Sequence, residues 1–126
     1  MIIHSPRTLV GLEKTVENIV ASLEDDKALD IVEIDLVGKT SIADRMVIAS
    51  GGSARLVNAM SEHIVEALKS VGIQPKTEGK GQCDWVLIDA GDIIIHLFRP
   101  EVRAFYNIEK IWAHTTDSDL PELVSA

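Results

Sequence analysis

The sequence predicts one α/β (α+β) domain in which helices cover a mixed β-sheet of about five strands. Helix-like and strand-like segments occur in the order helix, strand, strand, helix, strand, strand, strand, and such an order places helices over a sheet. The chain has 126 residues, of which 46% are apolar and 25% charged, as expected for one globular domain. The single cysteine excludes an internal disulfide, so the core must be held by packing alone.

The first two elements are predicted from a change in the spacing of apolar residues along the chain. Apolar residues recur at helical spacing over residues 9–23, which indicates an amphipathic helix ending near Asp25. Residues 28–36 alternate instead, with the acidic side chains of Glu33 and Asp35 opposite the apolar ones. This alternation predicts a half-solvated strand.

A buried strand and a long helix follow. The continuous apolar run 46–49, stopped by two glycines, predicts a strand buried on both faces. Over residues 53–71 one face is apolar and the other charged, so we expect a helix with Ser53 as N-cap and Gly72 just beyond its end.

The last strands are expected at residues 74–78, 85–89 and 92–98. Pro75 places the first of these at an edge, because proline cannot donate to a central ladder. The other two form an antiparallel hairpin whose two-residue turn is expected at Ala90-Gly91.

Short helical pieces should close the domain. Pro100 opens one helical turn, and an apolar piece at residues 108–112 is expected to dock beside it. Residues 115–126 are polar and carry three acids and no base, which predicts a flexible acidic tail. The domain therefore spans residues 1–114.

Net charge restricts the class of partner. Twenty acidic and 12 basic residues give a formal charge of −8, which argues against a protein that binds nucleic acid through its phosphates. Charged partners should be basic. No apolar run approaches the ~20 residues of a membrane span, and a lone thiol fits the reducing cytoplasm.

An enzyme remains the alternative to a binding protein. Gly51-Gly52-Ser53, between a strand and a helix, is also the arrangement of a nucleotidyltransferase, which needs carboxylates that converge on divalent metal. The carboxylates of Asp89 and Asp92 are the candidates, although aspartate flanking a turn is common for conformational reasons. The four histidines are dispersed and form no metal-binding pair, so no metal or cofactor is indicated.

Two histidines occupy ordered segments. His63 lies at the border of the apolar helix face and is expected to be partly buried with one hydrogen bond. His96 lies on a strand between apolar neighbours, where it is either a hydrogen-bonded core residue or part of a recognition surface.

Aromatic residues are concentrated near the end of the chain. Four of the five fall between Phe98 and Trp112, with Arg99 and Arg103 among them; the fifth is Trp85. They form either the core under the last helices or an interface rich in aromatic residues and arginine.

Three blocks resemble one known family. Residues 91–112 read GDIIIHLFRPEVRAFYNIEKIW, and residues 44–53 and 78–89 read DRMVIASGGS and EGKGQCDWVLID. In this order they are similar to the Iojap-like ribosomal silencing factors, and the resemblance covers about residues 8–114.

The resemblance implies a nucleotidyltransferase-like fold without working catalytic carboxylates. Family members bind the large ribosomal subunit at its fourteenth protein, block joining of the small subunit and so repress translation under nutrient limitation; some are homodimers off the ribosome. It assigns ribosomal contacts to the tryptophan and tyrosine that match Trp85 and Tyr106. With the clustering above, the expected ribosome-binding residues are Trp85, His96, Arg99, Arg103 and Tyr106. No specific DNA binding and no membrane association are expected.

Two positions depart from the family pattern. An aromatic residue often stands where this chain has Arg45, and another where it has Ala90. Local contacts at the interface are therefore expected to differ there.

Overall fold

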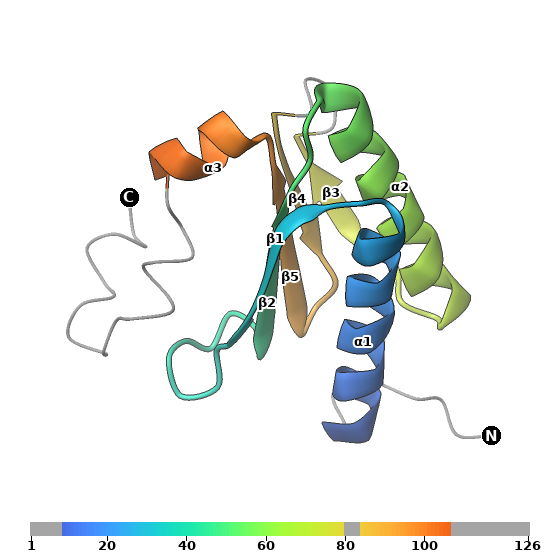
Figure 1. Cartoon of the computed structure of the whole chain (residues 1–126). Helices are drawn as coiled ribbons and strands as arrows, with labels where there is room; N and C mark the ends of the chain where they lie inside the picture. The colour runs from blue at the N-terminus through green and yellow to red at the C-terminus, as the bar shows by residue number, and fades with distance from the viewer. Residues whose placement is uncertain (1–8, 80–83, 107–126) are drawn as a thin grey trace.

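The computed structural model describes residues 9–79 and 84–106, which form one sheet with two long helices on one face and a short helix on the other (Figure 1). The strands are β1 (Leu29–Asp35), β2 (Arg45–Ser50), β3 (Lys76–Glu78), β4 (Trp85–Asp89) and β5 (Ile93–Phe98). The helices are α1 (Leu9–Asp25), α2 (Ala54–Ser70) and α3 (Pro100–Tyr106). The predicted mixed sheet of five strands is confirmed.

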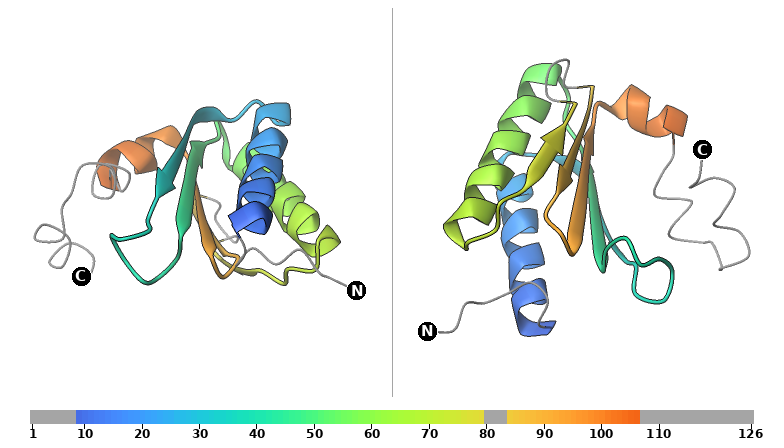
Figure 2. Two further views of the ribbon diagram at one scale, coloured as in Figure 1. Left: turned by 90° about the horizontal axis from the view of Figure 1, so that it is seen from below. Right: turned by 180° about the vertical axis from the view of Figure 1, so that it is seen from behind.

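The sheet has the order β1-β2-β5-β4-β3. β2 and β5 run parallel at its centre, and the other neighbouring pairs are antiparallel. Views from below and behind show α1 and α2 side by side against one face, with α3 on the opposite side (Figure 2).

The larger core lies between the long helices and the sheet. α1 contributes Leu12, Val16, Ile19 and Leu23, all buried at the spacing that predicted the helix. α2 begins as predicted, because the Ser53 hydroxyl accepts from the Leu56 amide at 3.1 Å. Gly72, just beyond its end, has a φ of 85°.

A second apolar cluster lies on the other face of the sheet. Its buried members are Ile34, Leu36, Ala43, Met46 and Ile48. β2 therefore buries side chains in both directions, as its continuous apolar run predicted. The exposed carboxylates of β1 lie on the α1 side.

The hairpin between β4 and β5 is confirmed, but its turn is one residue later than predicted. The Ala90 amide donates to the Ile93 carbonyl at 2.9 Å, so the turn consists of Gly91 and Asp92. Gly91 has a φ of 89°, which glycine adopts without strain, and its amide donates to Asp89 Oδ1 at 2.9 Å. The prediction chose the correct glycine but placed it second in the turn instead of first.

The predicted edge strand and closing helix are also present, as β3 and α3. The expected piece at residues 108–112 and the acidic tail at 115–126 lie outside the described residues. In the described part of the chain, no helix is long and apolar enough to cross a membrane.

Candidate functional site: an aromatic cluster on the sheet face opposite the long helices

Strand register brings three rings together on the sheet face that α1 and α2 leave uncovered. Trp85 pairs with Phe98 across β4 and β5, and His96 lies two residues before Phe98, on the same face. We call Trp85, His96 and Phe98 the aromatic cluster. Because β4 and β5 are antiparallel neighbours, this contact joins residues that are 11 to 13 positions apart in the chain.

The cluster is tightly packed. The Trp85 and Phe98 rings stack with centroids 4.8 Å apart and an interplanar angle of 28°. The His96 ring is tilted against both, at 5.8 Å from Trp85 and 5.7 Å from Phe98. Phe98 is fully buried and supports the other two rings.

A hydrogen bond fixes the polar edge of the cluster. Trp85 Nε1 donates to His96 Nδ1 at 2.9 Å. Burial lowers the pKa of His96 to about 4, so its imidazole is neutral at neutral pH. Of the two interpretations of His96, the structure supports the hydrogen-bonded core residue, which here contacts the candidate recognition residue Trp85.

Trp85 is the outermost residue of the cluster. It is partly buried and lines a hollow of about 330 Å³, together with Leu87, Glu78 and Gly79. Gly79 has a φ of 89°, and a Cβ there would lie 2.1 Å from the Trp85 carbonyl oxygen. Only glycine allows β3 to end so close to the backbone of Trp85.

The two candidate arginines have different environments. Arg99 follows β5 and remains partly exposed, and its guanidinium pairs with Asp84 at 3.3 Å and Glu101 at 2.6 Å. Arg103 is only 8% exposed and donates to Ser50 Oγ at 2.9 Å and to the Leu29 carbonyl at 3.5 Å. Arg103 therefore attaches α3 to the sheet, whereas Arg99 can contribute at the surface.

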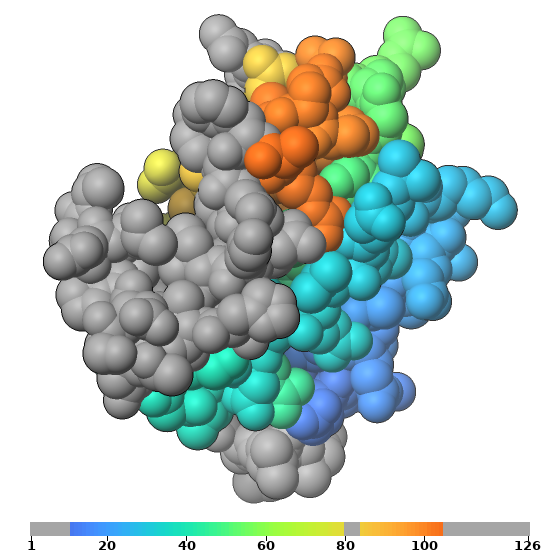
Figure 3. Space-filling view, turned by 60° about the vertical axis from the view of Figure 1, so that its left-hand side comes forward, coloured from blue at the N-terminus to red at the C-terminus, as the bar shows by residue number. Residues whose placement is uncertain are grey.

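Tyr106 is the last residue of α3, and its side chain lies outside the described part of the chain. In the space-filling view the orange residues of α3 border the start of α2, in green, and β1, in cyan (Figure 3). The helix that carries Tyr106 begins one residue after the end of β5, the strand that holds His96 and Phe98.

Local spacing could not have identified the partners of these arginines. Ser50 and Arg103 are 53 residues apart, and Asp84 and Arg99 are 15 apart. The sequence did place Asp84 near the candidate site, because Asp84 directly precedes Trp85 in one of the three sequence blocks.

The structure separates the parts of the alternative nucleotidyltransferase site. Gly51 follows the end of β2, whereas the Asp92 carbonyl accepts from the Arg45 amide at the start of β2. Six residues of strand, about 20 Å, lie between these ends. The Asp89 carboxylate accepts from its own turn. These carboxylates therefore cannot act on a phosphate held at Gly51-Gly52-Ser53.

Within residues 9–79 and 84–106, no group of three or more histidine, cysteine, aspartate and glutamate side chains is placed to hold a metal ion.

His63 makes its expected hydrogen bond, to Asp26 at 2.7 Å, but its side chain is 55% exposed and the prediction of partial burial is wrong. The pKa of His63 is raised, chiefly by that hydrogen bond.

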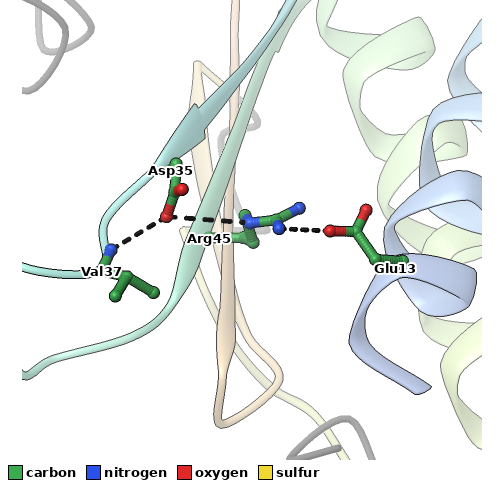
Figure 4. A network of polar contacts seen from close by, with 4 residues as sticks. All are labelled: Glu13, Asp35, Val37 and Arg45. Atoms are coloured by element: carbon green, nitrogen blue, oxygen red, sulfur yellow. Dashed lines mark hydrogen bonds and ion pairs between the residues drawn. The ribbon is translucent and has the colours of Figure 1, made fainter. Parts of the chain in front are cut away.

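The two departures from the family pattern lie away from the aromatic cluster. Arg45 begins β2 and joins Glu13 of α1 to Asp35 of β1 (Figure 4). Ala90 begins the hairpin turn at the opposite end of β4 from Trp85. Both residues therefore lie at the end of the sheet opposite Trp85, where their contacts are with other parts of the fold.

Comparison with known proteins identifies the family. Residues 11–126 match the family described as "Ribosomal silencing factor during starvation", RsfS. The chain belongs to the RsfS family. It is 54% identical to ribosomal silencing factor RsfS of Zymomonas mobilis over 121 residues, covering 93% of this chain and 91% of that one.

More distant relatives extend the likeness. The chain is 31% identical over 125 residues to a mouse protein named mitochondrial assembly of ribosomal large subunit protein 1, covering 95% of this chain and 55% of the mouse protein. A crystal structure of a Chromobacterium violaceum protein superimposes with a TM-score of 0.78 at 36% identity, covering 82% of this chain and 88% of that one. The Iojap-like resemblance is confirmed.

Proposed function

We propose that this RsfS-family chain binds the large ribosomal subunit through its fourteenth protein and sterically prevents joining of the small subunit. Translation would thereby be repressed under nutrient limitation, in the cytoplasm and without catalysis. Membership of the silencing-factor family supports the proposal, as does the name of the mouse relative, which concerns assembly of the ribosomal large subunit. A homodimer is the proposed form off the ribosome.

The observation that carries the proposed contact is the rigid placement of Trp85. Its ring is stacked on a fully buried phenylalanine, hydrogen-bonded through its nitrogen, and bordered by a hollow. A partner that packs on such a ring gains contact area with little loss of side-chain entropy. Trp85 is therefore the proposed anchor, with Tyr106 as the second aromatic contact.

The other expected residues take different parts in this proposal. Arg99 stands beside the anchor and contributes at the rim, where its two carboxylate neighbours already compensate its charge. Arg103 acts indirectly, because it holds the helix that ends at Tyr106. His96 is too buried to offer more than a small contact of its own.

Charge favours a basic protein as the partner. The net charge of −8 repels the phosphates of ribosomal RNA and attracts a basic ribosomal protein. Glu78 on the hollow beside Trp85 has the same sign. Long-range attraction would thus select the encounter, and the aromatic contact would supply the short-range energy.

Two measurements test the proposal. In co-sedimentation with purified large subunits, Trp85→Ala and Tyr106→Ala should lose binding while remaining folded by circular dichroism, with Val37→Ala as an exposed apolar control at the far end of the sheet. In subunit reassociation followed by light scattering, excess wild-type protein should prevent joining without added nucleotide. Unchanged reassociation would reject steric blocking, and tight binding by both folded variants would reject these contacts.

A further inference from the structure

Trp85 and His96 can form their hydrogen bond only when the imidazole is neutral and is in one of its two tautomers. Tryptophan Nε1 is a donor and never an acceptor, so His96 Nδ1 must carry a lone pair and no proton. The proton of the neutral ring is therefore on Nε2. A protonated imidazole would present a second N–H to the indole N–H and break the contact.

His96 is a buried residue of the sheet and not a surface residue. In the register it lies between Leu87 of β4 and Ile48 of β2, and its ring packs against Phe98. Only 9% of the residue is exposed. Its position is thus set by strand pairing and by the buried ring beneath it.

We infer that His96 is a positioning residue, which fixes the indole of Trp85 in the orientation that the ribosomal partner meets. This inference rests on the proposed function, in which Trp85 is the anchor. Stacking on Phe98 restricts the plane of the indole, and the hydrogen bond selects which edge of the ring faces inward. Without the acceptor, the indole is less ordered in the free protein, and the entropy lost when the partner orders it weakens binding.

The test compares two substitutions at one position. His96→Leu keeps apolar bulk and removes the acceptor, and its dissociation constant for the large subunit should rise about tenfold. His96→Gln offers a carbonyl acceptor and should stay within about threefold of wild type. Both should keep the circular dichroism spectrum of the wild type. Equal binding by His96→Leu and wild type would overturn the inference.

A second background shows whether His96 acts through the indole nitrogen. Trp85→Phe keeps a ring for stacking and removes the N–H donor. Adding His96→Leu to Trp85→Phe should weaken binding by less than about twofold, because the interaction is already absent. A further tenfold loss in that background would mean that His96 acts by another route.

A measurement on the wild-type protein is independent of how the variants fold. Long-range ¹H–¹⁵N correlation of the His96 ring should give an unprotonated Nδ1 and a protonated Nε2 at neutral pH. A protonated Nδ1 would overturn the inference outright. Failure of the proposed function is seen separately, because a folded Trp85→Ala variant would then bind as tightly as wild type.

Discussion

Arg103 Nη1 donates to the hydroxyl oxygen of Ser50 at 2.9 Å, which joins α3 to the last residue of β2 beneath the surface. Both residues are almost fully buried. The same guanidinium reaches the Leu29 carbonyl of β1 at 3.5 Å. One side chain therefore holds the short helix against two strands that precede it by more than fifty residues.

Removal of this contact should destabilise the protein. Arg103→Met retains most of the buried apolar volume but loses the charged donors, so the free energy of unfolding should fall by about 1.5–3 kcal/mol. Urea unfolding followed by circular dichroism measures the change. Arg99→Met is the matched control and should cost about 1 kcal/mol or less, because its ion pairs are partly exposed. Equal losses would show that the buried contacts of Arg103 stabilise the fold no more than the partly exposed ion pairs of Arg99.

Acid should weaken the attachment of α1 at Arg45 (Figure 4). A hydrogen bond to Arg45 lowers the pKa of Glu13 below its ordinary value of 4.5. A lowered folded pKa gives a contribution that is present above pH 4.5 and is lost as the pH falls through the folded value. Glu13→Gln should therefore reduce the urea midpoint at pH 7 and converge with wild type as the pH falls through the folded pKa of Glu13. Glu17→Gln, on the exposed side of α1, is the matched control for loss of a carboxylate that has no contact with Arg45.

The His63–Asp26 pair should respond in the opposite direction. The hydrogen bond to Asp26 raises the pKa of His63 above 6.5, so the pair contributes fully below pH 6.5 and loses its effect as the pH rises through the folded value. A proton NMR titration of His63 should give a midpoint above 6.5, and Asp26→Asn should lower it. A midpoint that Asp26→Asn leaves unchanged would contradict the contact.

Sequence patterns were sufficient for most of the fold because each element has its own period or terminator. Ser53 and Gly72 bound α2 as local chemistry requires. The turn at Gly91 was misplaced by one residue, since the dipeptide alone does not say which turn position glycine occupies. Alternation in β1 likewise identified an apolar face but not its side, which proved to be the side away from α1.

The candidate site was less accessible to sequence reasoning. The sequence predicted a concentration of aromatic residues between Phe98 and Trp112, but Phe98 is the only one of these whose side chain the structure describes. The observed cluster joins it to Trp85, and that contact depends on the register of β4 and β5. The roles of Arg99 and Arg103 depend on Asp84 and Ser50, which are distant in the chain. Nothing in the local sequence distinguishes a buried arginine from an exposed one four residues earlier.

Salt should slow the association of the protein with its proposed basic partner. Residues 1–36 carry eight acids and three bases, and the exposed carboxylates of Glu17 and Glu24 extend along α1. Raising the salt concentration shortens the Debye length to ~8 Å at physiological ionic strength, which screens attraction before contact but changes the packed aromatic interface little. With the purified fourteenth ribosomal protein, stopped-flow association should slow about tenfold between low and physiological salt, and dissociation should change by less than about twofold. The double substitution Glu17→Lys and Glu24→Lys should slow association at low salt and weaken its salt dependence. An association rate that does not change with salt would rule out electrostatic steering and leave the aromatic contact as the basis of recognition.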